Sequence, residues 1–78
     1  MELEALEEAI RRVLQVYPSE IHLDSVLTTD LGADSIDLVQ MLKFVEEKLN
    51  VSFGDTDLDR LVTVEDVLNF IKRGTKHE

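Results

Sequence analysis

Hydrophobic residues recur at helical spacing along three stretches of this 78-residue chain. In each stretch, apolar side chains three or four positions apart fall on one face, and in the first stretch charged side chains fill the other. The pattern predicts helices over about 2–16, 36–50 and 64–73, and a fourth, short helix over about 56–61. The expected fold is therefore all-α: a small four-helix bundle of three longer helices and one short helix.

Residues 17–34 show no sustained period and are expected to form a long loop between the first two helices. A loop of this length needs its own apolar side chains packed into the core, in the manner of an Ω-loop. The candidates are Ile21, Leu23, Val26, Leu27 and Leu31. We expect one domain over 1–78, with an ordered core over about 2–73 and a flexible tail over 74–78.

Particular residues mark the ends of the predicted helices. Pro18 stops the first helix, and Asp34 or Ser35 can cap the start of the second. Thr63 and Asp66 have the spacing of a capping box at the start of the last helix, with Asp in place of the usual Glu. Gly74 is expected at the C′ position that ends it.

The chain is strongly acidic. Seventeen acidic residues against eight basic residues give a formal net charge of −9. Nucleic acid and anionic membranes are poor partners for such a surface, whereas a basic protein surface complements it. The absence of cysteine excludes disulfides, thiolate metal sites and a cysteine nucleophile. No apolar run could span a bilayer and the N-terminus is acidic, so the expected location is the cytoplasm.

The residues from Asp30 to Asp37, D-L-G-A-D-S-I-D, place Ser35 at the predicted start of the second helix. A serine at this place is either a helix cap or a handle for covalent modification. A phosphate ester would meet the free N–H groups and the dipole of the helix start. Asp34 and Asp37 would repel it. The local chemistry therefore permits a phosphoester without requiring one.

Other kinds of site find less support in the sequence. A nucleophilic serine needs a positioned base, and no pattern places His22 or His77 beside Ser35. The aspartates at 55, 57 and 59 have the spacing that opens an EF-hand loop. The glycine and glutamate that such a loop requires further along are replaced by Arg60 and Asp66. We expect neither an enzyme nor a metal site.

The octapeptide closely resembles the signature of the acyl carrier protein family, whose modified serine matches Ser35. The likeness extends to Glu46-Glu47, to residues 51–53 and to Thr63-Val64. It implies that Ser35 bears a 4′-phosphopantetheine arm, transferred from coenzyme A by a phosphopantetheinyl transferase (holo-carrier synthase). The thiol of the arm would hold acyl groups as thioesters. The protein would then carry intermediates and catalyse nothing itself.

The resemblance also implies which surfaces meet partner enzymes. The second helix would be the recognition face of a monomeric carrier, docking on basic patches of acyltransferases, ketosynthases, reductases and dehydratases. The recognition residues implied are Asp34, Ile36, Asp37, Val39, Gln40, Lys43, Glu46 and Glu47. The acyl chain would shelter between the helices, where Val45 and Leu61 are the candidate cavity residues.

Five residues depart from the pattern usual in the family. Gln40 stands where glutamate is common, Lys43 replaces an apolar residue, and Lys48 replaces an acid. Phe44 replaces a small residue, and Gly54 replaces proline. The second helix is thus less acidic than that of a housekeeping carrier. The leading hypothesis is a carrier for type II fatty-acid biosynthesis. The alternatives are a specialised carrier for a polyketide, aminoacyl or other lipid pathway, and a carrier-like helical adaptor that is never modified.

Overall fold

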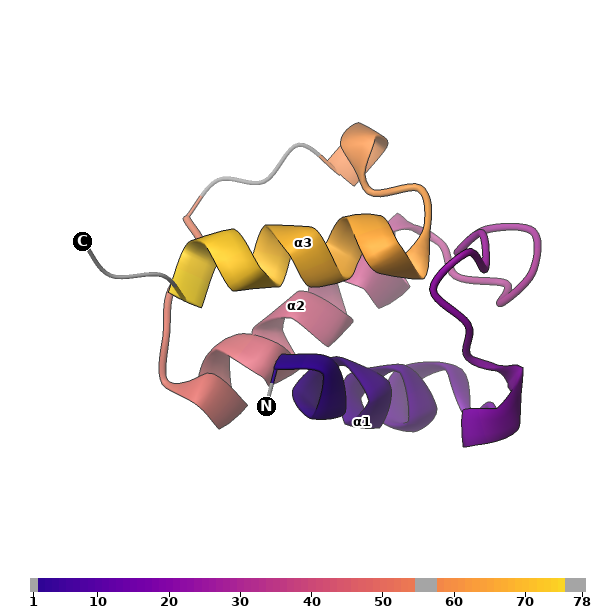
Figure 1. Ribbon diagram of the computed structural model, residues 1–78, viewed down its shortest axis with the longest axis horizontal. Helices are drawn as coiled ribbons and strands as arrows, with labels where there is room; N and C mark the ends of the chain where they lie inside the picture. The colour runs from indigo at the N-terminus through magenta and orange to yellow at the C-terminus, as the bar shows by residue number, and fades with distance from the viewer. Residues whose placement is uncertain (1, 55–57, 76–78) are drawn as a thin grey trace.

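The computed structural model describes residues 2–54 and 58–75. The helices in these ranges are α1 (Glu2–Leu14), α2 (Ser35–Leu49) and α3 (Val64–Thr75), with single 3-10 turns at Pro18–Glu20 and Leu58–Arg60. Figure 1 shows the three α-helices gathered around a common centre, with the long connection between α1 and α2 at one end. The all-α prediction is confirmed. None of the helices in the described ranges combines the length and apolarity needed to cross a membrane.

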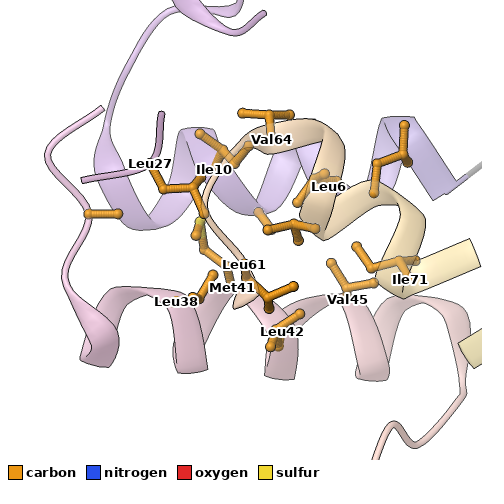
Figure 2. Close-up of a cluster of buried hydrophobic side chains, with 14 of the residues drawn as sticks. Leu6, Ile10, Leu27, Leu38, Met41, Leu42, Val45, Leu61, Val64 and Ile71 are labelled. Carbon is orange, nitrogen blue, oxygen red and sulfur yellow. The ribbon is translucent and has the colours of Figure 1, made fainter. Parts of the chain in front are cut away.

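Apolar side chains from all three helices and from the connecting segments form one core, part of which is drawn in Figure 2. The largest fully buried side chains are Leu6, Ile10, Met41, Val45, Val64, Val67 and Ile71. Each of these stabilises the fold by about 1.5–3 kcal/mol relative to an exposed position. The apolar stripe predicted for α2 runs through Leu38, Met41, Leu42, Val45 and Leu49. It is confirmed, because the first four are buried and Leu49 packs partly buried against the core.

Two residues in the left-handed conformation end the first two helices. α1 ends at Leu14, two residues earlier than predicted, because Gln15 adopts φ 57° and donates its N–H to the Arg11 carbonyl at 2.8 Å. Asn50 ends α2 with φ 56°. Asparagine enters this region more readily than most residues, which explains its place there. Pro18 lies beyond the end of α1 and begins the first 3-10 turn.

The long loop is anchored much as predicted. Ile21, Leu27 and Leu31 are buried, whereas Leu23 is 47% exposed. The loop also pairs with the start of α3: the N–H of Leu27 donates to the Val62 carbonyl at 2.9 Å. An isolated antiparallel bridge joins the loop to the same segment, at positions 26 and 63. The loop therefore fixes the segment that leads into α2 against the start of α3.

The fourth, short helix is not confirmed. It is predicted over about 56–61, but the described part of this segment contains only the 3-10 turn at Leu58–Arg60, closed by a 3.1 Å bond from the Leu61 N–H to the Leu58 carbonyl. The rest of the predicted element, up to residue 57, lies outside the described residues.

Gly74 has a different role from the one predicted. It lies inside α3, which continues to Thr75, and its φ is not in the left-handed region. A Cβ at this position would overlap the Phe53 ring, so glycine is required for a close approach rather than for a turn. The Phe53 ring also packs on Phe70, with 5.2 Å between ring centroids. The predicted tail beyond Thr75 lies outside the described residues.

Candidate functional site

Ser35 is the first residue of α2, and its side chain is exposed. The cap is Asp34, whose Oδ1 accepts the Asp37 N–H at 2.9 Å. Asp37 returns the contact, because its Oδ2 accepts the Asp34 N–H at 3.2 Å. The two aspartates thus form a capping box with aspartate at both ends. Of the two cap candidates, the structure selects Asp34, and the Ser35 hydroxyl is left for another use.

The first N–H groups of α2 are open. Within the described residues, the N–H groups of Ser35 and Ile36 have no hydrogen-bond acceptor, whereas the N–H of Asp37 is satisfied by the cap. Free N–H groups and the positive end of the helix dipole together favour an anion at this place. The start of α2 therefore offers a hydroxyl for esterification and two donors for the oxygens of a phosphate.

The rest of the octapeptide holds Ser35 in this position. Leu31 and Ala33 are buried, and the Ala33 N–H donates to the Leu27 carbonyl at 2.8 Å. Gly32 between them has φ 73°, a conformation that side chains with a Cβ rarely adopt. The Asp30 carboxylate closes the preceding turn by accepting the Val26 N–H at 2.8 Å. No spacing in the sequence predicts this role of Asp30.

A cavity of about 240 Å³ opens beside Ser35. Its lining residues come from the loop, from the first two turns of α2, and from the segment around the second 3-10 turn: Leu27, Thr28, Ala33, Asp34, Ser35, Leu38, Leu58, Asp59, Leu61 and Val62. Figure 2 shows Leu27, Leu38 and Leu61 near one another in the core. Of the two predicted cavity residues, Leu61 lines this space, whereas Val45 is fully buried further along α2 and is not one of the lining residues.

The outer face of α2 presents most of the predicted recognition residues to solvent. Ile36 is 68% exposed and Val39 is 40% exposed, and Gln40, Lys43 and Glu47 are also exposed. They follow one another at helical spacing, so they form one stripe that begins next to Ser35. We call this surface the outer stripe.

Glu46 differs from the outer stripe because it is half-buried and has a structural partner. Its Oε2 accepts the Phe53 N–H at 2.8 Å and so ties α2 to the segment that follows it. Both residues line a second cavity of about 240 Å³, together with Val39, Leu42, Lys43, Gly54 and Leu58.

Two of the residues that depart from the family pattern have contacts inside the molecule. The Arg12 guanidinium lies 5.4 Å from the centre of the Phe44 ring, and the Lys48 ammonium lies 2.8 Å from Glu8. Arg12 also contacts Glu8, at 3.1 Å. The hydrogen bond from Lys48, with the charges of Lys48 and Arg12, holds the pKa of the Glu8 carboxyl below its usual value. Phe44 and Lys48 therefore join α2 to α1, while Gln40 and Lys43 stay on the outer stripe.

The other candidate sites gain no support in the described residues. His22 is exposed and lies in the loop, and no hydrogen bond links it to Ser35. Among residues 2–54 and 58–75, no group of three or more histidine, aspartate and glutamate side chains could hold a metal ion. The aspartates at 55 and 57 lie outside the described residues.

An exposed serine at an open helix start can accept a phosphate-linked group. Comparison with known proteins agrees, because the phosphopantetheine attachment site family matches residues 4–71 of this chain. The acyl carrier protein of Campylobacter concisus (strain 13826) is 36% identical over 70 residues, which cover 90% of this chain and 91% of that protein. The chain belongs to the family of acyl carrier proteins.

Further relatives carry the same name. The acyl carrier protein of Wolinella succinogenes is 36% identical over 67 residues, covering 86% of this chain and 88% of that protein. The acyl carrier protein of Phaeodactylum tricornutum is 34% identical over 68 residues, covering 87% of this chain and 90% of that protein. Membership of this family makes the chain a carrier protein rather than an enzyme, with a covalently attached 4′-phosphopantetheine group.

The residues at the start of α2 fit this group. The phosphodiester needs a hydroxyl that solvent and another enzyme can reach, and the Ser35 side chain is exposed. The open N–H groups of Ser35 and Ile36 can receive the phosphate oxygens. The cavity beside Ser35 has apolar lining residues, among them Leu27, Leu38 and Leu61.

Proposed function

We propose that Ser35 is the attachment residue and that the chain carries acyl groups as thioesters on a 4′-phosphopantetheine arm bound there. The observation that carries this proposal is that Asp34, and not Ser35, caps α2. Because Asp34 caps the helix, the Ser35 hydroxyl is exposed and has no structural partner in the described residues. The Ser35 hydroxyl has no capping role and is therefore available for covalent chemistry.

The outer stripe and the acids around it serve partner recognition in this proposal. Asp34, Asp37, Glu46 and Glu47 supply negative charge, and Ile36 and Val39 supply the apolar contact between them. One carrier must leave each enzyme after it has reacted, so contacts at the rim should tune the association rate more than the final affinity. The partners are a phosphopantetheinyl transferase and enzymes that add, extend, reduce and dehydrate acyl groups.

The cavity beside Ser35 is the proposed shelter for the acyl chain. Leu61 and Leu38 line it, and Leu58 lines both this cavity and the second one. An acyl chain that enters beside Ser35 could therefore continue toward Phe53. Val45 remains a predicted cavity residue that a longer chain would reach only if the core opened around it.

For the pathway, we propose type II fatty-acid biosynthesis, in which a discrete carrier serves separate enzymes. A specialised carrier for a polyketide, aminoacyl or other lipid pathway is the second candidate, and a particular observation favours it. Gln40 and Lys43 lie on the outer stripe, so two of the departures from the family pattern fall where partners would dock. The cytoplasm remains the predicted location.

A reconstitution assay separates the two pathways. The holo-protein is incubated with malonyl-coenzyme A, a bacterial malonyl transferase and the ketosynthase that starts fatty-acid synthesis, with acetyl-coenzyme A as primer. The fatty-acid hypothesis predicts an acetoacetyl thioester on the arm, detected by intact mass. A holo-protein that takes up neither malonyl nor acetoacetyl groups contradicts it and favours the specialised carrier.

A further inference from the structure

Most of the acidic groups near Ser35 accept hydrogen bonds from backbone N–H groups of the same chain. Asp34 and Asp37 each accept a backbone N–H in the capping box, at 2.9 and 3.2 Å. Glu46 accepts the Phe53 N–H at 2.8 Å. Each of these carboxylates is therefore oriented by the fold, and part of its hydrogen-bonding capacity is used before a partner arrives.

Lys43 and Glu47 are different. Both are exposed on the outer stripe, and neither makes an ion pair or a side-chain hydrogen bond within the described residues. They are one helical turn apart, with the lysine nearer the N-terminus, which is the weaker order for a pair within a helix. Lys48, only one residue further on, is by contrast bound to Glu8 at 2.8 Å. Lys43 and Glu47 are thus a cation and an anion on the outer stripe that have no ion-pair partner within the described residues.

An enzyme that reaches Ser35 through an ordinary interface centred on the outer stripe also covers these two charges. Lys43 lies eight positions after Ser35 and Glu47 lies twelve positions after it, which is about 12 Å and about 18 Å along the helix axis. A typical interface covers about 800 Å² on each partner, equivalent to a disc of about 16 Å radius. Ile36 and Val39 lie on the same stripe, and their burial would remove water from around Lys43. A charge that loses its water in this way needs a partner.

We propose that the phosphopantetheinyl transferase that loads this carrier presents a carboxylate opposite Lys43 and a cation opposite Glu47. The proposal rests on the proposed attachment at Ser35. A uniformly basic surface would match Glu47 but would set a like charge against Lys43, and like charges in contact disfavour a complex. The order of the two charges along α2 then selects a transferase with the opposite order and rejects one whose surface is basic throughout.

The test is the rate of pantetheine transfer, kcat/KM, with coenzyme A and the transferase of the same organism that loads the parent chain. We expect Lys43→Glu to lower kcat/KM about tenfold, which corresponds to one misplaced charge contact. A uniformly basic docking surface predicts the opposite sign, because the variant adds an acid. An unchanged or increased kcat/KM for Lys43→Glu overturns the proposal.

A charge exchange tests the order itself. The double variant Lys43→Glu with Glu47→Lys keeps the net charge of the chain and places the pair in the order that favours the helix. We expect it to be loaded at least as slowly as Lys43→Glu. The matched control is the exchange Glu7→Arg with Arg11→Glu on α1, which has the same spacing and also preserves net charge. We expect it to stay within about twofold of the parent, and an equal loss in this control overturns the proposal.

Loading by a broad-specificity transferase separates this proposal from the assignment of Ser35. If the parent gains no pantetheine from either transferase, the attachment at Ser35 fails, and the docking proposal fails with it. If the parent is loaded and Lys43→Glu is loaded equally fast by the organism's own enzyme, only the docking proposal fails. Circular dichroism of each variant confirms that the compared proteins are folded.

Discussion

α2 and α3 begin with the same local motif and use it differently. Each start has a capping box with aspartate at its fourth position. In α2 the box joins Asp34 and Asp37, and in α3 the Thr63 Oγ1 accepts the Asp66 N–H at 3.1 Å while the Asp66 carboxylate accepts the Thr63 N–H at 3.0 Å. The two motifs differ in the residue that follows the cap, which is an exposed Ser35 in α2 and a buried Val64 in α3.

The long loop accounts for this difference. It supplies backbone carbonyls to the start of α3, where the Val64 N–H donates to Ser25 at 3.0 Å and the Glu65 N–H donates to Leu23 at 2.9 Å. The corresponding donors of α2, on Ser35 and Ile36, receive no such partner in the described residues. One helix start is therefore closed by the fold, and the other is left open for a ligand. The capping motif alone does not distinguish them, since the distinction comes from tertiary contacts.

The largest effect should come from exchanging the residues that follow the two caps. Val64 is 1% exposed, so Val64→Ser loses apolar burial and places a hydroxyl in the core. We expect it to lower the free energy of unfolding by about 2–4 kcal/mol. Ser35→Val should change it by less than about 0.5 kcal/mol, because the side chain is exposed and does not cap the helix. Urea unfolding measures the free energy of unfolding of both variants. Equal losses in Val64→Ser and Ser35→Val would show that the residue after the cap is no more buried in α3 than in α2.

Removing the caps should have smaller and more similar effects. Asp34→Ala and Thr63→Ala each remove the acceptor for an orphan N–H and should each cost about 1 kcal/mol. Both can be measured in the same urea series. A cost for Ser35→Ala that equalled the cost for Asp34→Ala would mean that the serine shares the capping role, and it would weaken the argument that its hydroxyl is free.

The pH dependence of stability should report on the α3 box. Hydrogen bonds from the backbone N–H groups of Thr63 and Val62 hold the pKa of Asp66 below its usual value in the folded protein. A carboxyl with a lowered folded pKa contributes stability that is present above its unfolded pKa and is lost as the pH falls through the folded pKa. We expect the parent to lose more stability than Asp66→Asn between about pH 5 and pH 2. Parallel pH curves would contradict this role of Asp66.

The smallest effect concerns charge spread over the whole surface. With a net charge of −9, repulsion between acids should loosen the native state at low ionic strength and neutral pH. Sodium chloride should raise the melting temperature by a few degrees, and a divalent cation should do so at lower concentration. A melting temperature that stays flat from low to moderate salt would show that this repulsion does not limit stability.

The sequence predicts the parts of the molecule that depend on neighbours along the chain. The apolar stripe of α2, the Thr63–Asp66 box and the place of Ser35 all follow from periods and spacings within a few residues. The hydrogen bond between Glu46 and Phe53 joins α2 to a residue beyond its end. The packing of Phe53 against Gly74 joins segments that are far apart in the sequence. Sequence spacing gives no sign of such contacts, and this is why Gly74 is mistaken for a helix end.

The same limit applies to the candidate site. The family pattern identifies Phe44, Lys48 and Lys43 as departures, but it does not say which of them face a partner. The fold separates them, because Phe44 lies beneath Arg12 and Lys48 pairs with Glu8, whereas Lys43 has no such contact among residues 2–54 and 58–75. Contacts with α1 decide which of these residues face solvent, and spacing along the sequence does not predict those contacts.

The most direct test of the account is the intact mass of the protein after incubation with coenzyme A and a broad-specificity phosphopantetheinyl transferase. Ser35→Ala is measured alongside, and Ser52→Ala, at another exposed serine, is the matched control. The account predicts a gain of one phosphopantetheine group in the parent and in Ser52→Ala, and no gain in Ser35→Ala. A folded Ser35→Ala that still gains the group, or a folded parent that gains none, would contradict the assignment of Ser35 as the attachment residue.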